Sequence, residues 1–238
     1  MRKTSLVLTV AALLLTAGTT SSAAVSKNQR RLVLVSSLQK FGLNKYKWLY
    51  SFLDASTISM GQAGLGGNYA GVSVIQDANG TKATFVNCLR HTSANPSVKA
   101  IDVVLSLHGA DEKLYFHDGK VVASDLEAEL KTIPNRSKFR LMYNLACYGS
   151  THRNNFRNSG FRTAIGSRKV NTASASEYPV FISRWNMGHN VSFIFAQTNA
   201  DPAVQVSDNV AKSWGFSDAD SFKLISGTTG LTINSNAN

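Results

Sequence analysis

Two runs of apolar residues constrain the fold of this chain more than any other feature. One covers Ile101–Leu107 with the sequence IDVVLSL, and the other covers Phe139–Ala146 with the sequence FRLMYNLA. Runs with so few polar positions are typical of strands that are buried on both faces of a parallel sheet. Parallel strands need long crossover connections, which are usually helices. The two runs therefore predict a sheet that is covered by helices on both faces.

The other segments alternate as such a sheet requires. We expect further strands at 70–76, 161–165 and 180–183, and helices at 46–53, 82–92, 124–132, 187–198 and 202–214. The apolar cluster at 32–35 fits either a helix or a strand, and the glycine-rich stretch 61–71 is expected to be a loop. The fold class predicted is α/β, a three-layer sandwich with a mostly parallel central sheet.

Local signals define several element boundaries. Asp118-Gly119 lies between two apolar ends in 115–122 and predicts a hairpin. Ser124 and Glu127 have the spacing of a capping box, which predicts that a helix begins there. Asp201-Pro202 predicts another helix start, with Asp as the N-cap and Pro in the first helical position.

The N-terminus has the features of a secretory signal peptide. Arg2 and Lys3 precede the apolar run Leu6–Leu15, and small residues follow up to Ala24. The apolar run is too short to span a membrane, which takes about 20 residues, and no later segment is long and apolar enough. We expect cleavage near Ala24, a secreted or periplasmic protein, a single domain at 25–227 and a polar, loosely ordered tail at 228–238.

The net charge of +11 does not by itself indicate a nucleic-acid partner. The excess is concentrated in one segment, in Arg153, Arg157, Arg162, Arg168 and Lys169, with His152 beside them. No nucleic-acid-binding motif accompanies the cluster. We expect a solvated basic face, no nucleic-acid partner and no membrane span.

Reactive residues follow both buried strands. The first strand ends in Leu107-His108-Gly109, and the second ends in Ala146-Cys147. Ligands of open α/β sheets bind at the carboxyl ends of the strands, and a cysteine becomes a nucleophile when a base lies beside it. His108 and Cys147 therefore form a candidate catalytic pair, and the N–H of Gly109 is a candidate oxyanion donor.

The chain has two cysteines, and in an exported protein an even number first suggests a disulfide. Cys88 is expected in the middle of a covering helix, far from a strand end, so a bond to Cys147 is disfavoured on geometry. His152 is the alternative base if His108 does not serve. No His or Cys spacing typical of a metal site is present, so we expect no metal and no cofactor.

The segment Ile101–Gly149 resembles the caspase-like cysteine peptidases, which include caspases, gingipains, clostripain, legumain and the CHAT domains. In that group one apolar strand ends in His-Gly and a later one ends in Ala-Cys, as VVLSLHG and LMYNLACYG do here. Leu145 departs from the caspase pattern, which has Gln at that position. The hairpin and helix between the strands are most similar to the CHAT arrangement. The resemblance covers roughly residues 70–185 and implies a Cys147–His108 dyad with an oxyanion hole at Gly109 and Cys147.

The same resemblance suggests where substrate binds. The sequence NTASASE, from Asn171 onward, is similar to the segment that walls the specificity pocket in the family. It implies that Ser174, Ala175 and Ser176 contact an extended substrate through their backbone. Glu177 and Asp77 would give the pocket negative charge and favour Arg or Lys before the scissile bond, unless both are ordinary surface acids.

The function expected is that of a secreted cysteine endopeptidase acting on peptide or protein substrates. Two alternatives stay open at this point. The fold could serve as a binding or structural module with an idle dyad, or the same dyad could hydrolyse other acyl compounds.

Overall fold

The computed structural model describes residues 24–237, so the predicted signal peptide lies outside the described residues apart from Ala24. The strands are β1 (Arg30–Ser37), β2 (Gly71–Gln76), β3 (Ala100–Ala110), β4 (Lys113–Phe116), β5 (Gly119–Val122), β6 (Phe139–Asn144), β7 (Thr163–Ser167) and β8 (Lys223–Gly227). The longer helices are α1 (Lys47–Met60), α2 (Lys82–Ala94), α3 (Ala123–Lys131), α4 (Gly149–Asn158), α5 (Ser174–Asn186), α6 (Val191–Ala200) and α7 (Pro202–Ser213).

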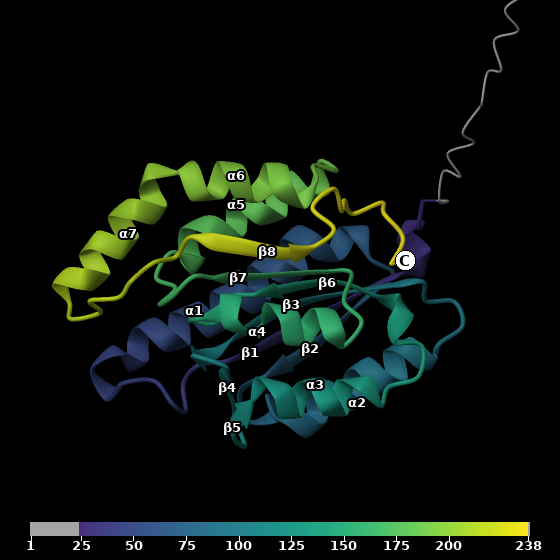
Figure 1. Cartoon of the computed structure of the whole chain (residues 1–238), viewed down its shortest axis with the longest axis horizontal. Helices are drawn as coiled ribbons and strands as arrows, with labels where there is room; N and C mark the ends of the chain where they lie inside the picture. Colours follow the sequence, from purple (N-terminus) through teal and green to yellow (C-terminus); the bar gives the residue numbers. More distant parts are fainter. Residues whose placement is uncertain (1–23, 238) are drawn as a thin grey trace, which may run out of the picture.

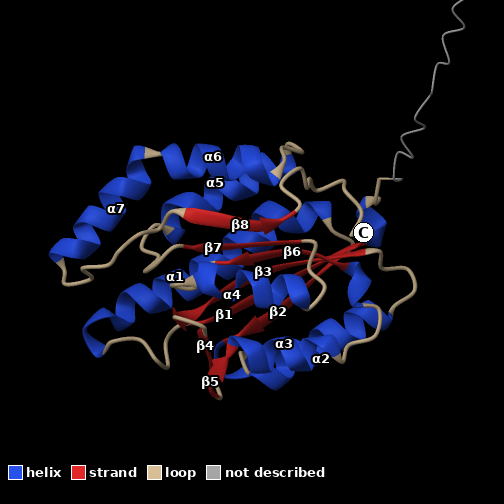
Figure 2. Cartoon of the chain, in the orientation of Figure 1, coloured by secondary structure: helices blue, strands red, loops and turns tan. Residues whose placement is uncertain are grey.

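The central sheet has the order β2-β1-β3-β6-β7-β8 (Figure 2). Its first five strands pair in parallel, and β8 pairs antiparallel with β7 at the edge. The two apolar runs form the neighbouring central strands β3 and β6, as predicted. The ambiguous cluster at 32–35 belongs to β1, which lies between β2 and β3. The hairpin β4–β5 extends the end of β3 by antiparallel pairing.

Helices cover both faces of the sheet (Figure 1), and the buried side chains form two core clusters. On one face α2, α3 and α4 contribute side chains such as Phe85, Leu126 and Phe156. On the other face α1, α5 and α6 contribute side chains such as Ile58, Trp185 and Ile194. The predicted three-layer α/β sandwich is confirmed. Its burial on both faces explains why β3 and β6 are apolar almost throughout.

Several local predictions are wrong. Residues 180–183 lie inside α5 rather than in a strand, and α6 begins only at Val191. The segment 61–71 is not a simple loop, because a π-helical turn and a 3-10 turn precede β2. The capping box does not form, because β5 runs directly into α3 with Val122 as the N-cap, and Glu127 instead binds Lys131 at 2.5 Å.

The polar tail is not loosely ordered. Leu231 and Ile233 are buried in the same core cluster as α5 and α6, at 0 % and 3 % exposure. The carbonyls of Ile233 and Ser235 accept hydrogen bonds from Arg140, at 2.5 and 2.7 Å. The tail therefore closes one end of this core, although its composition is mostly polar.

The carboxyl ends of the parallel strands meet at one edge of the sheet, where α7 and the first turn of α1 also lie (Figure 1). Asp201 caps α7 as predicted, accepting a hydrogen bond from the backbone N–H of Ala203 at 2.8 Å. These elements surround the candidate site. Among the described residues, no helix is both long and apolar enough to cross a membrane.

Candidate active site

His108 extends from the end of β3 and is oriented by a backbone carbonyl. Its Nε2 lies 2.6 Å from the carbonyl oxygen of Leu38. A carbonyl only accepts, so the neutral ring carries its proton on Nε2 and leaves the Nδ1 lone pair available as a base. Burial lowers the pKa of His108 below its ordinary value of 6.5, which keeps the ring neutral near pH 7.

The backbone of Leu38 is itself held in place by Asp54, a residue of α1. Its N–H donates to both carboxylate oxygens of Asp54, at 3.0 and 3.1 Å, and Ser36 donates to the same carboxylate at 2.5 Å. Asp54 is 1 % exposed. A chain of contacts therefore runs from the buried carboxylate of Asp54, through the backbone N–H and C=O of Leu38, to the imidazole of His108.

Cys147 lies on the turn between β6 and α4. The backbone N–H of Asn171 donates to its Sγ at 3.4 Å. Burial raises the pKa of the Cys147 thiol above its ordinary value, while the Asn171 N–H and the positive charge of Lys223 act in the opposite direction. The resting group is a neutral thiol, so attack on a carbonyl requires a base to accept its proton.

Gly109 and Cys147 touch through their backbones. A Cβ added to Gly109 would lie 2.1 Å from the carbonyl oxygen of Cys147, so no other residue fits there without movement. Cys147 also precedes the N-terminus of α4, where Tyr148 adopts a left-handed conformation with φ 54°. Unpaired N–H groups at a helix start favour a nearby negative charge. The structure thus brings the two residues predicted as oxyanion donors into contact.

His108, Gly109 and Cys147 open into one cavity of about 510 Å³. Its walls come from α1, from 170–175 and from α7 together with the turn that follows α7. Ser174 and Ala175, predicted as substrate contacts, line this cavity, whereas Ser176 does not: its hydroxyl donates to the carbonyl of Ala173 at 3.0 Å.

The two acids predicted for the specificity pocket lie elsewhere. Asp77 is exposed after β2 and accepts a hydrogen bond from Gln39 at 3.2 Å. Glu177 is buried and pairs with Lys223 at 2.7 Å, with both side chains at 0 % exposure. Neither acid lines the cavity beside Cys147. The predicted preference for Arg or Lys before the scissile bond was based on these two charges and is therefore not supported.

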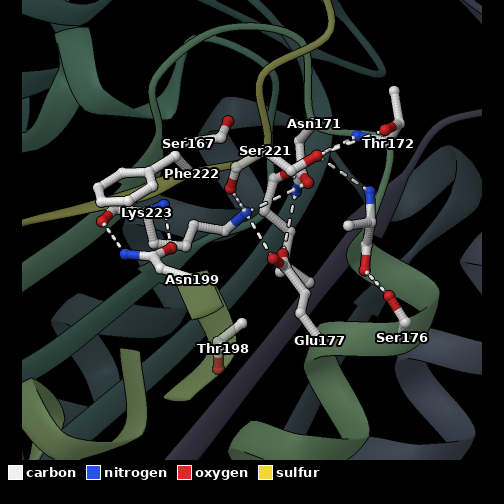
Figure 3. A network of polar contacts seen from close by, with 12 residues as sticks. Ser167, Asn171, Thr172, Ser176, Glu177, Thr198, Asn199, Ser221, Phe222 and Lys223 are labelled. Carbon is white, nitrogen blue, oxygen red and sulfur yellow. Dashed lines mark hydrogen bonds and ion pairs between the residues drawn. The ribbon is translucent and has the colours of Figure 1, made fainter. Parts of the chain in front are cut away.

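Glu177 instead belongs to a polar network with Asn171 and Lys223 (Figure 3). Lys223 Nζ contacts Asn171 Oδ1 at 3.2 Å, and Asn171 Nδ2 contacts Glu177 at 3.2 Å and the carbonyl of Leu145 at 2.8 Å. Asn171 is the residue whose backbone N–H binds Sγ. The buried ion pair therefore holds the segment that contacts the thiol.

His152 does not qualify as the alternative base. It is fully buried, with Nδ1 at 3.1 Å from Asn144 and Nε2 at 3.0 Å from the carbonyl of Ala110. These contacts bridge the ends of β6 and β3, which carry Cys147 and His108. His152 thus supports the geometry of the site without opening into it.

The two cysteines are free thiols, and no disulfide joins Cys88 to Cys147.

Three of the arginines expected on a solvated face are partly buried against the chain. Arg153 donates to the carbonyl of Ile225 at 2.9 Å, Arg157 to the carbonyl of Phe161, and Arg162 to Asn236 at 2.7 Å. Within residues 24–237, no group of three or more His, Cys, Asp and Glu side chains is placed to hold a metal ion.

Leu38, Asn171 and Lys223 are parts of the site that sequence reasoning missed. Leu38 acts through a backbone carbonyl, which leaves no trace in the residue type. Asn171 and Lys223 are 52 positions apart, and their contact depends on the pairing of β7 with β8. Of the three, only Asn171 lies in a segment that the sequence had already indicated as part of the site, the segment NTASASE.

The order of strands and helices in this chain is found in solved structures. The chain superposes on caspase-1 from Spodoptera frugiperda with a TM-score of 0.57 and 13 % identity, covering 88 % of this chain and 91 % of that one. This chain has a caspase-like fold. The Drosophila initiator caspase Dronc gives a TM-score of 0.51 and 13 % identity, with coverage of 90 % and 84 %.

Sequence comparison alone does not detect this relationship. No protein-family model matches the chain, and no curated protein sequence matches it. At 13 % identity the likeness establishes the caspase-like fold, and the chemistry has to be argued from the residues of this chain.

Proposed function

We propose that this chain is an exported cysteine endopeptidase with a Cys147–His108 dyad. One observation carries the proposal. A thiol and a neutral imidazole with a free Nδ1 lone pair open into the same cavity, beside a glycine that contacts the cysteine backbone. The predicted signal peptide would place its substrates outside the cell or in the periplasm.

The mechanism uses only groups of the chain and water. The Cys147 proton passes to Nδ1 of His108 as Sγ bonds to the scissile carbonyl carbon. The N–H groups of Gly109 and Cys147 stabilise the oxyanion that forms. Collapse breaks the C–N bond, and the leaving amine takes the proton from His108. A water molecule, deprotonated by His108, then attacks the thioester and releases the acid, and the proton returns to the thiol.

Digestion of a denatured protein by the chain that begins at residue 25 tests the proposal. We expect cleavage that is lost in Cys147→Ala and in His108→Ala and kept in Cys88→Ala, the matched cysteine control. Hydrolysis of thioesters or esters without peptide cleavage would indicate an acyl hydrolase. No reaction with either kind of substrate would indicate an idle dyad, and either result would overturn the proposal.

A further inference from the structure

The cavity beside Cys147 has walls without formal charge. Its apolar lining comes from α1, α7 and the turn after α7, in Leu49, Leu53, Val206, Val210, Trp214 and Phe216. Besides His108 and Cys147, the polar side chains of the lining are the neutral Asn171, Thr172, Ser174 and Ser207 and two tyrosines. Among the described residues that line it, none is Asp, Glu, Lys or Arg.

Acidic groups flank these walls, and their oxygens accept hydrogen bonds from the chain. The Asp218 carboxylate, whose charge acts on Cys147, accepts from the hydroxyl of Tyr148. Asp208, on the inner side of α7, accepts hydrogen bonds from Thr172 at 2.6 Å and from the N–H and hydroxyl of Ser221 at 2.9 and 2.6 Å. The Asp54 carboxylate is bound to Leu38 and Ser36, and Glu177 is bound to Lys223. None of these charged side chains lines the cavity, so none is in contact with a ligand bound there.

The order of the strands indicates which part of a substrate meets which wall. Cys147 follows β6, which lies between β3 with His108 and β7 with the segment 170–175. His108 protonates the leaving amine, so the amine side of the scissile bond faces β3. The acyl side therefore faces 170–175 and α7, where Val206 and Val210 are 59 % and 44 % exposed.

We propose that this half of the cavity binds an uncharged, apolar or aromatic side chain on the residue immediately before the scissile bond. The proposal rests on the proposed function for the role of Cys147. A charged side chain would lose its hydration there without gaining an opposite charge. An apolar side chain would instead cover apolar surface that now faces solvent.

A peptide series that differs only in the residue before the cleaved bond tests this inference. We expect kcat/KM for Phe or Leu to exceed that for Arg and for Asp by about 50-fold or more. Val210→Asp should place a carboxylate in the wall and raise the Arg-to-Phe ratio by about tenfold. Asn209→Asp adds the same charge to the same helix outside this cavity, and it should leave the ratio unchanged.

The outcomes separate the two proposals. Cleavage after Arg or Asp at rates equal to or above those for Phe would overturn the inference and leave the peptidase assignment intact. An unchanged Arg-to-Phe ratio in a folded Val210→Asp variant would also overturn the inference. Absence of cleavage across the series and in the denatured protein would overturn the proposed function and the inference with it.

Discussion

The imidazole of His108 is oriented by the carbonyl of Leu38 and not by a carboxylate that contacts the ring. Asp54 acts one step away, through the peptide N–H of Leu38. The hydrogen bond to Leu38 therefore selects the tautomer of the ring, and among the described residues no carboxylate contacts the ring. Burial then dominates the pKa of His108 and lowers it.

The lowered pKa of His108 determines the pH at which activity falls on the acid side of the pH–rate profile. His108 accepts the thiol proton only when it is neutral, and a lowered pKa keeps it neutral to lower pH. We expect the acid limb of kcat/KM to have its midpoint below the ordinary histidine value of 6.5. A pH–rate profile measures this, and a midpoint above 7 would contradict the burial argument.

Burial raises the pKa of the Cys147 thiol, and the buried positive charge of Lys223 acts in the opposite direction. Lys223→Met removes that charge and should raise the pKa of Cys147, as followed by thiolate absorbance in a Cys88→Ala background. It also leaves the buried Glu177 carboxylate without its positively charged partner, at a cost of about 3–5 kcal/mol in the free energy of unfolding.

A double variant separates these two effects. Glu177→Gln with Lys223→Met replaces the ion pair with neutral side chains of similar size, and it should recover most of the lost stability. The pKa of Cys147 should stay raised, because the cation is still missing. Recovery of the pKa together with the stability would show that Lys223 acts only through packing.

At the scale of elements, α1 and β1 position the base. Asp54→Ala in α1 leaves the buried N–H of Leu38 and the hydroxyl of Ser36 without their acceptor. We expect a loss of about 3 kcal/mol in the free energy of unfolding, measured by urea denaturation. In the protein that remains folded, kcat should fall more than KM changes, because the carbonyl that holds His108 is no longer fixed.

Asp54→Asn provides the matched control. Its amide oxygen can still accept from Ser36 and Leu38, as Oδ1 of Asp54 does, but the side chain lacks the charge and the second acceptor oxygen. Both stability and kcat should therefore lie between those of the native chain and Asp54→Ala. If Asp54→Ala lowers stability and leaves kcat of the folded protein unchanged, the helix is a structural support only.

The elements differ in how well the sequence predicted them. The strands β3 and β6 were predictable because burial on both faces leaves continuous apolar runs. His108 lies in β3, and Cys147 lies on the turn that follows β6. The segment 180–183 was misread because a short apolar run fits either periodicity. The buried positions Tyr178, Phe181 and Trp185 have helical spacing, which appears only when a longer window is considered.

At the scale of the molecule, the C-terminal tail is part of the core that supports the sheet. Arg140 pairs with Asp102 at 2.5 Å and also binds two carbonyls of the tail. This burial could not be predicted from the sequence, because two apolar residues among many polar ones do not indicate a buried segment. The contacts of Arg140 with residues 233 and 235 join positions more than 90 residues apart.

Truncation measures the contribution of the tail. Removal of residues 228–238 withdraws Leu231 and Ile233 from the core, at about 2 kcal/mol each, and leaves Arg140 with fewer partners. We expect the free energy of unfolding to fall by at least about 4 kcal/mol. Leu231→Ala alone should cost about 2–3 kcal/mol. A truncated chain with native stability would show that the tail only lies on the surface.

The central claim is that His108 activates Cys147, and the rate of alkylation of Cys147 tests it most directly. Cys88 is a control within the same chain, because burial raises the pKa of its thiol as well and it lies on α2, away from the cavity. Iodoacetamide labelling at pH 7.5, followed by peptide mapping, compares the two thiols in the native chain and in His108→Ala. We predict that Cys147 reacts at least about tenfold faster than Cys88, and that His108→Ala removes this advantage. Equal rates for the two thiols, unaffected by His108→Ala, would contradict the account.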